Sequence, residues 1–117
     1  MPDNRAIDPV AVTAAQKQML TGRSERDARR ILDSLCDPTR LKIVRALEET
    51  PLAASDLAHV IGRTRSATSQ HLRVLREIEA VAATRSGNVV RYRLADSTIA
   101  KVLRDACRAF DRLAQAS

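Results

Sequence analysis

The sequence predicts a mainly α-helical fold that carries one β-hairpin, and three observations lead to this prediction. Apolar residues recur at helical spacing in several segments, most clearly over 97–114. The stretch from Ser55 to Arg76 is typical of two short helices joined at Gly62. From Val81 to Leu94 the apolar period changes to the alternation of two paired strands.

Length and composition indicate a soluble single-domain protein with a polyanionic partner. The chain has 117 residues, of which 44% are hydrophobic and 29% charged, and its formal net charge is +6. Aromatic residues make up only 2%, too few to stack unpaired bases, which favours double-stranded DNA. No apolar run is long enough to span a membrane, and no signal peptide is recognisable. We therefore expect a cytoplasmic protein without a membrane partner.

The sequence contains no recognisable catalytic or metal-binding motif. HExxH, P-loop, GxGxxG and GxSxG sequences are absent. The two cysteines, Cys36 and Cys107, are too few and too far apart for a disulfide framework or a CxxC-type zinc site. The sequence thus argues against an enzyme, and we expect no cofactor and no metal.

Two helices are expected before residue 37. Asp8 as a cap and Pro9 at the first helical position predict a helix that continues to about Leu20. After a break, Ser24 and Asp27 resemble a capping pair and predict the start of a second helix. An N-terminal helix this apolar is unusual on so small a domain. We therefore expect it to pack on a partner subunit.

The next two helices are bounded by cap and turn residues. Asp37-Pro38 predicts the start of a helix that ends at Thr50-Pro51. The following helix is predicted to start at Ser55, whose hydroxyl would cap it, and to end at a left-handed Gly62. Its apolar stripe is expected to comprise Leu57, Val60 and Ile61.

The helix after Thr64, its predicted cap, has two chemically different sides on a helical wheel. Arginine matches guanine edges or phosphates, glutamine can pair with adenine, and serine allows close approach to the backbone. The pattern favours DNA reading, with an ordinary solvated helix surface as the alternative. The core side holds Ala67, Thr68, His71, Leu72, Leu75 and Ile78. The outer side, which has no carboxylate, holds Arg65, Ser66, Ser69, Gln70, Arg73 and Arg76.

The predicted hairpin turns at Ser86-Gly87-Asn88 and carries Val90, Tyr92 and Leu94 on one side. Arginines at 85, 91 and 93 are expected to give it a positive side. A basic hairpin directly after a basic helix is typical of a winged helix-turn-helix, in which the hairpin reaches the neighbouring backbone or minor groove. An edge hairpin kept soluble by arginine is the alternative. The wing residues expected to contact DNA are Arg85, Asn88 and Arg91.

Asp96 is predicted to cap the last helix, from Ser97 to about Ala114. One small domain can bury only part of its long apolar stripe, so we interpret the remainder as a dimer seam shared with the N-terminal helices. Intramolecular packing is the alternative. The stripe comprises Ile99, Val102, Leu103, Ala106, Cys107, Phe110 and Leu113.

The predicted organisation is a single winged helix-turn-helix domain over 1–117. Residues 1–23 form an N-terminal arm with a helix, 24–95 the winged-helix core, and 96–117 the C-terminal dimerisation helix.

Three segments, in order and at matching spacing, resemble the ArsR/SmtB family of bacterial transcriptional repressors: DPTRL at 37–41, SATSQHLRVL at 66–75 and GNVVRYRL at 87–94. The resemblance covers roughly Ile31 to Leu113. It implies a winged-helix homodimer, joined through its terminal helices, that binds an inverted-repeat operator and leaves it when an effector arrives. The recognition residues it implies are Arg65, Ser66, Ser69, Gln70 and Arg73, with His71 in the family's HL pair. Because the wheel turns His71 towards the core, an orienting, phosphate-touching or packed role is expected for it.

The sequence departs from the metal-sensing members of the family. They typically carry an ELCVCDL-like segment, whereas residues 50–57 read TPLAASDL, with alanines in place of the thiolates. At the family's other site Asp96 is in place, but Thr98, Ala109 and Arg112 occupy the remaining ligand positions. The resemblance therefore implies the fold and DNA binding without the metal.

Cys36 and Cys107 are candidates for a thiol switch, because both are expected near the dimer seam. Small buried hydrophobes are the alternative. Dithiol-sensing members place their first cysteine where this sequence has Arg45.

The sequence leads to three functional hypotheses. The first is a homodimeric repressor whose effector is undefined. The second is a redox- or persulfide-responsive repressor that uses Cys36 and Cys107. The third is a protein-interaction module built on the same scaffold.

Overall fold

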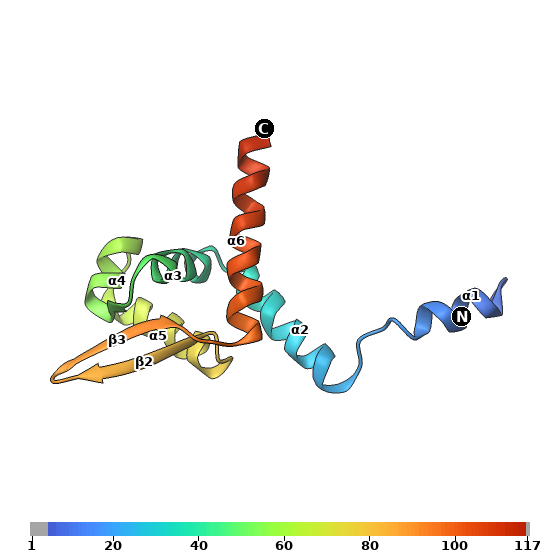
Figure 1. The fold of residues 1–117 in the computed structure, drawn as a ribbon, viewed down its shortest axis with the longest axis horizontal. Coiled ribbons are helices and arrows are strands. Elements are labelled where there is room, and N and C mark those ends of the chain that lie inside the picture. The colour runs from blue at the N-terminus through green and yellow to red at the C-terminus, as the bar shows by residue number, and fades with distance from the viewer. Residues whose placement is uncertain (1–4, 117) are drawn as a thin grey trace.

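The computed structural model describes residues 5–116, and within them the chain forms six helices and one three-stranded antiparallel sheet (Figure 1). The predicted fold class, mainly helical with a β-hairpin, is confirmed. In chain order the elements are α1 (Pro9–Gln16), α2 (Gly22–Leu35), α3 (Pro38–Glu49), β1 (Leu52–Ala53), α4 (Ala54–Ile61), α5 (Arg65–Glu77), β2 (Val81–Ser86), β3 (Val89–Leu94) and α6 (Thr98–Ala116).

One hydrophobic core joins α3, α4, α5 and α6 to the base of the sheet. Full burial of a large aliphatic side chain contributes about 1.5–3 kcal/mol, so these leucines and isoleucines hold the helices in place. In Figure 1, α1 lies far from this body, at the end of an extended segment that precedes α2. The side chains with no exposed surface include Ile43 of α3, Leu57 of α4, Leu75 of α5 and Leu103 of α6.

Three of the predicted helix caps are confirmed. The side chains of Asp8 and Thr64 each accept a hydrogen bond from the backbone amide three residues further on, at 3.1 and 3.0 Å. Asp37 accepts one from the amide of Thr39 at 2.9 Å. Each bond satisfies an amide that has no partner inside its helix, which fixes where α1, α5 and α3 begin.

Two other predicted caps are wrong, because the chain enters the helix earlier than the cap pattern indicates. Thr21 is extended and α2 begins at Gly22, so Ser24 lies inside the first turn. Ala53 still pairs with β3 as part of β1, and α4 starts directly after it, which places Ser55 inside the helix.

Asp96 was also expected to be a cap, and Ser97 performs this role instead. The Ser97 hydroxyl oxygen accepts a hydrogen bond from the amide of Ala100 at 3.1 Å and donates one to the carbonyl oxygen of Glu79 at 2.7 Å. Because the second bond ties the start of α6 to the turn after α5, α6 begins one residue later than predicted.

Two further expectations need correction. α1 ends at Gln16 rather than near Leu20, because the chain then forms tight turns in which the Gln18 and Met19 amides bond to carbonyls three residues back.

Val60 was assigned to the apolar stripe of α4, but it is 60% exposed. The face of α4 that meets the core is formed by 54, 57, 58 and 61, at helical spacing, and Val60 lies outside it.

The hairpin follows the predicted alternation and gains an unpredicted third strand. β2 and β3 pair from Val81↔Leu94 to Ser86↔Val89 around a two-residue turn, in which Gly87 adopts a positive φ of 63°. β1 pairs with the other edge of β3, which gives the strand order β1-β3-β2. No helix within 5–116 has the length and apolar character needed to cross a bilayer.

Replacing Leu75 by alanine is expected to lower the free energy of unfolding by about 2–5 kcal/mol, because it leaves a cavity in the core. Val60→Ala, on the exposed side of α4, is the matched control and should change it by less than about 0.5 kcal/mol. Urea denaturation of both variants at one protein concentration measures the difference. Equal effects would contradict the assignment of these two side chains.

Candidate nucleic-acid interface

The outer face of α5 lies in solvent while its opposite side is buried. Thr68, Leu72 and Leu75 face the core, and the six residues of the outer side are all exposed. The surface carries guanidinium, hydroxyl and amide groups and no carboxylate, as the sequence predicts. We refer to this set as the outer face of α5: Arg65, Ser66, Ser69, Gln70, Arg73 and Arg76.

A tight turn fixes the angle between α4 and α5. Gly62 is left-handed, with φ 68° and ψ 37°, and its amide bonds to the carbonyl of His59 at 3.3 Å. The Arg63 amide bonds to the carbonyl of Ala58 at 3.0 Å. This pattern ends α4, and Thr64 caps α5 directly afterwards. The confirmed left-handed glycine therefore positions α5 relative to α4 with only three residues between the two helices.

His71 lies beside α3 rather than on the outer face of α5. Its side chain is 24% exposed, and its Nδ1 is 3.6 Å from Oδ2 of Asp37. The Nε of Arg40 lies at the same distance from that oxygen. Asp37 also caps α3, so one carboxylate links the start of α3 to the middle of α5. The side chain of His71 therefore faces the Asp37 carboxylate instead of the solvent-exposed side of α5.

The arginines of the hairpin do not share one side, contrary to expectation. Cross-strand partners point to the same side of a sheet, and successive residues alternate. Arg85 is paired with Val90, whereas Arg91 is paired with Thr84. Arg91 and Arg93 therefore lie on one side of the hairpin and Arg85 on the other.

At the tip of the hairpin, the Arg85 Nε donates a hydrogen bond to the carbonyl oxygen of Gly87 at 3.2 Å. Arg85 therefore lies against the turn formed by Gly87 and Asn88, and Arg85, Asn88 and Arg91 are all exposed. The three residues predicted for the wing are thus all in contact with solvent, two of them near the tip and Arg91 on the side of the hairpin that it shares with Arg93, which we call its outer side.

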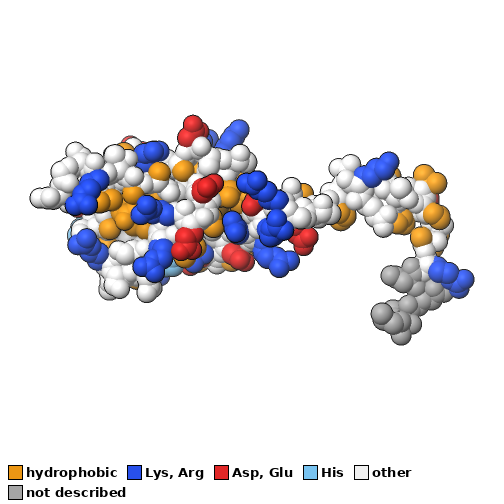
Figure 2. Space-filling view, turned by 90° about the horizontal axis from the view of Figure 1, so that it is seen from below, with side chains coloured by type: hydrophobic (Ala, Val, Ile, Leu, Met, Phe, Trp, Pro, Cys, Tyr) orange, Lys and Arg blue, Asp and Glu red, His pale blue; other side chains and the backbone are white. Residues whose placement is uncertain are grey.

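Figure 2 shows the molecule from below the view of Figure 1. Lysine and arginine side chains spread along this face from the hairpin end to α2, with apolar side chains between them, and most acidic side chains lie toward the α2 end. The hairpin end of the molecule is therefore the part of this face where positive charge is least offset.

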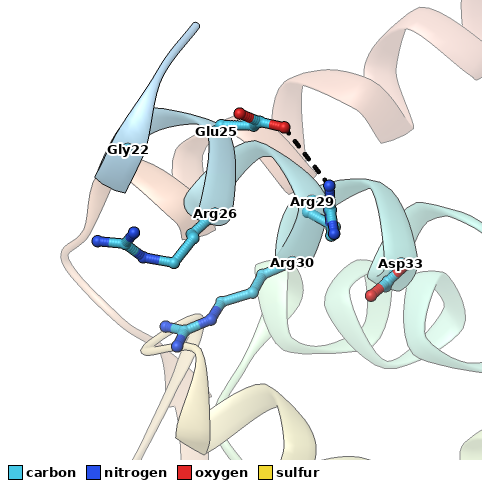
Figure 3. A pocket seen from close by; sticks show the side chains of 6 residues that line it. All are labelled: Gly22, Glu25, Arg26, Arg29, Arg30 and Asp33. Carbon is cyan, nitrogen blue, oxygen red and sulfur yellow. Dashed lines mark hydrogen bonds and ion pairs between the residues drawn. The ribbon is translucent and has the colours of Figure 1, made fainter.

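A hollow of about 400 Å³ on α2 is lined by both basic and acidic side chains, unlike the outer face of α5 (Figure 3). All of its lining residues come from this one helix, and the Arg29 Nη2 lies 3.4 Å from Oε1 of Glu25. Alternating charges of this kind are typical of a solvated helix surface. The lining residues are Gly22, Glu25, Arg26, Arg29, Arg30 and Asp33.

An ion pair links α3 to α6. The Arg45 Nη2 is 2.7 Å from Oδ1 of Asp111 and also donates a hydrogen bond to the carbonyl oxygen of Cys107 at 3.2 Å. The hydrogen bond from Arg45 lowers the pKa of Asp111 below its usual value. The stabilisation from this pair is therefore present above the pKa of unfolded aspartate and is lost as the pH falls through the lower pKa of the folded state.

The two cysteines occupy contrasting environments. Cys36 ends α2 and is exposed, whereas Cys107 is only 1% exposed and belongs to the core. Both are free thiols. Burial raises the pKa of the Cys107 thiol, which disfavours the reactive thiolate. Within residues 5–116, no three histidine, cysteine, aspartate or glutamate side chains form a group that could hold a metal ion.

Sequence reasoning missed two long-range polar contacts, Asp37 with His71 of α5 and Arg45 with Asp111 between α3 and α6. Each joins helices far apart in the chain, and no local spacing signals them. The exposure of the outer face of α5, by contrast, follows from periodicity within a single helix.

The elements described here form a winged helix-turn-helix, with α4 and α5 as the two helices of the motif and β2–β3 as the wing. The family model described as "Bacterial regulatory protein, arsR family" matches residues 37–82, from the start of α3 into β2. The chain is 31% identical over 101 residues to the transcriptional repressor SmtB homolog of a Synechocystis strain, covering 86% of this chain and 70% of that protein. This chain belongs to the ArsR family.

A further relative and a solved structure are also similar to this chain. The HTH-type transcriptional regulator NmtR of Mycobacterium tuberculosis is 41% identical over 75 residues, which cover 64% of this chain and 62% of NmtR. The chain thus spans about three-fifths of the length of the first curated relatives it matches. The homodimeric winged helix-turn-helix DNA-binding domain Mb0332 of Mycobacterium bovis has the same fold, with a TM-score of 0.68 at 23% identity, covering 84% of this chain and 96% of that one.

We expect an alkylating reagent such as N-ethylmaleimide to label Cys36 in the folded protein and to leave Cys107 unlabelled, because Cys107 is buried and its pKa is raised. Mass spectrometry of the peptides, with and without urea, measures both reactions. Unfolded protein, in which both thiols should react, is the control. Rapid labelling of Cys107 in the folded protein would contradict this assignment.

Proposed function

We propose that this protein is a sequence-specific, double-stranded-DNA-binding transcriptional repressor that acts as a homodimer and leaves its operator when an effector binds. The observation that carries the proposal is the outer face of α5, a solvent-exposed surface of guanidinium, hydroxyl and amide groups beside a basic hairpin. Similarity to the transcriptional regulator NmtR and to the transcriptional repressor SmtB homolog supports it.

The base-reading role is assigned to α5. A helix of this size fits the major groove, where arginine can donate two hydrogen bonds to a guanine edge and glutamine can exchange two with adenine. We assign these roles to Arg65, Arg73 and Gln70. Ser66 and Ser69 are small enough to let the helix approach the DNA backbone and can donate hydrogen bonds to phosphate.

The wing is assigned a supporting role. Arg85 and Asn88 at its tip, and Arg91 on its outer side, would reach the neighbouring backbone or minor groove. Such contacts position the protein and make its affinity fall steeply with salt. His71 holds α5 against α3 through Asp37 and reads no base in this proposal.

The homodimer is supported by apolar side chains that one protomer leaves uncovered on α2 and α6. Leu32 is 59% exposed and Phe110 is 43% exposed, on two helices that pack against each other. A second copy that covers this surface would pair two α5 helices for successive major grooves, about 34 Å apart. The homodimeric state of the Mb0332 domain is consistent with this arrangement.

The double variant Arg65→Ala/Arg73→Ala is expected to abolish specific DNA binding, because each bidentate base contact contributes about 1–3 kcal/mol of discrimination. A gel shift on the DNA upstream of the protein's own coding region, against shuffled DNA of equal length, measures the loss. Arg29→Ala on α2 is the control and should bind as the original protein does. If the double variant retains the regulatory function of the protein, the wing scaffold is a protein-interaction module instead.

Phe110→Asp is expected to convert the dimer into a protomer of 12.9 kDa, because the change places a carboxylate in the proposed apolar seam. Sedimentation equilibrium measures the mass, and Lys101→Ala, an exposed position on the same helix, is the control. A protein that sediments as a protomer before any substitution would refute the homodimer.

A further inference from the structure

The proposed function imposes a geometric requirement on the space between α5 and the wing. In B-form DNA the major groove and the neighbouring minor groove are separated by one sugar-phosphate strand. A protein that inserts α5 into the first groove and the hairpin into the second must straddle this strand. The strand therefore has to pass between α5 and the sheet, and the inference below rests on that proposed mode of binding.

The structure has a surface hollow at this place, with a volume of about 500 Å³. One wall comes from α5 and the other from Tyr92 of β3. Ser69, Arg73 and Arg76 follow one another at spacings of four and three residues, so they form a single stripe along the wing side of α5. The complete lining is Ser69, Arg73, Arg76, Glu77 and Tyr92.

The polar groups of this hollow are available to a ligand. Within residues 5–116, neither Arg73 nor Arg76 takes part in an ion pair, and the Tyr92 hydroxyl makes no hydrogen bond. The Tyr92 side chain packs partly against the core, which fixes its position. The hollow on α2 differs, because there Glu25 engages Arg29.

We propose that this hollow binds one phosphodiester group of the DNA strand that separates the two grooves, with Arg76 and Tyr92 as contacts additional to the base-reading residues. Phosphate oxygens accept charge-assisted hydrogen bonds from guanidinium groups and ordinary ones from serine and tyrosine hydroxyls. A phosphate held from both walls fixes the depth and register of α5 in the major groove.

Glu77 provides a further test of the proposal, because this acidic residue also lines the hollow. A negative charge there repels a phosphate, so Glu77 lowers the affinity of the hollow for the DNA backbone. Glu77→Gln removes this repulsion and keeps the size of the side chain. The variant should therefore bind DNA more tightly, which a purely structural role of the hollow would not produce.

The test compares Arg76→Ala, Tyr92→Phe and Glu77→Gln with the original protein in fluorescence anisotropy titrations on the upstream DNA and on shuffled DNA, over a series of salt concentrations. Arg76→Ala should weaken binding to both DNAs by the same factor, about tenfold or more. It should also flatten the slope of log affinity against log salt by about one unit. Tyr92→Phe should weaken both equally but leave the slope unchanged, and Glu77→Gln should strengthen both.

Arg112→Ala removes the same charge at the far end of α6 from α5 and is the matched control, with no expected effect on affinity (Figure 1). Unchanged affinity and slope in Arg76→Ala would overturn the phosphate site. A loss confined to the upstream DNA would overturn it as well, since Arg76 would then read a base. If the original protein shows no preference for the upstream DNA, the proposed function fails, while the salt slope on shuffled DNA still decides the phosphate contact.

Discussion

The structure depends on the one-sided burial of α5. Thr68, Leu72 and Leu75 are almost completely removed from water, and the Thr68 hydroxyl is satisfied by the carbonyl of Thr64 at 2.8 Å. Burial of this side holds the helix in one orientation and leaves the opposite side exposed to solvent. Since a carboxylate on that free side would repel a polyanion, the restriction of acidic residues to its edge at Glu77 matters as much as the presence of arginine.

The orientation of α5 is further defined by contacts at its start and in its middle. The Gly62 turn and the Thr64 cap fix its start, and the Asp37 carboxylate reaches its middle through His71. A helix held at its start and in its middle by polar contacts, and by burial along one side, presents its outer face with little positional variation. The surrounding fold therefore serves to hold one rigid surface in solvent.

Much of this arrangement could be predicted from the sequence, because it is encoded within single elements. The two sides of α5 and the alternation of β3 follow from periods of 3.6 and 2, which are local properties. The wrong cap assignments at Ser24 and Ser55 could not be avoided, because α2 and α4 begin after Thr21 and Ala53, neither of which makes a side-chain cap bond. At α6, Asp96 and Ser97 can both cap a helix, and the tertiary hydrogen bond to the Glu79 carbonyl favours Ser97. The pairing of β1 involves only two residues and leaves no periodic signal.

The two hydrogen bonds of Ser97 connect the start of α6 to the backbone that leaves α5. A single hydroxyl both starts the long C-terminal helix and holds the backbone of Glu79, a non-glycine residue kept at a φ of 64° just beyond α5. This backbone geometry is unfavourable for a side chain with a Cβ, so it persists only while the surrounding contacts enforce it. A displacement of the start of α6 would therefore be transmitted through this one hydroxyl to the backbone at the exit of α5.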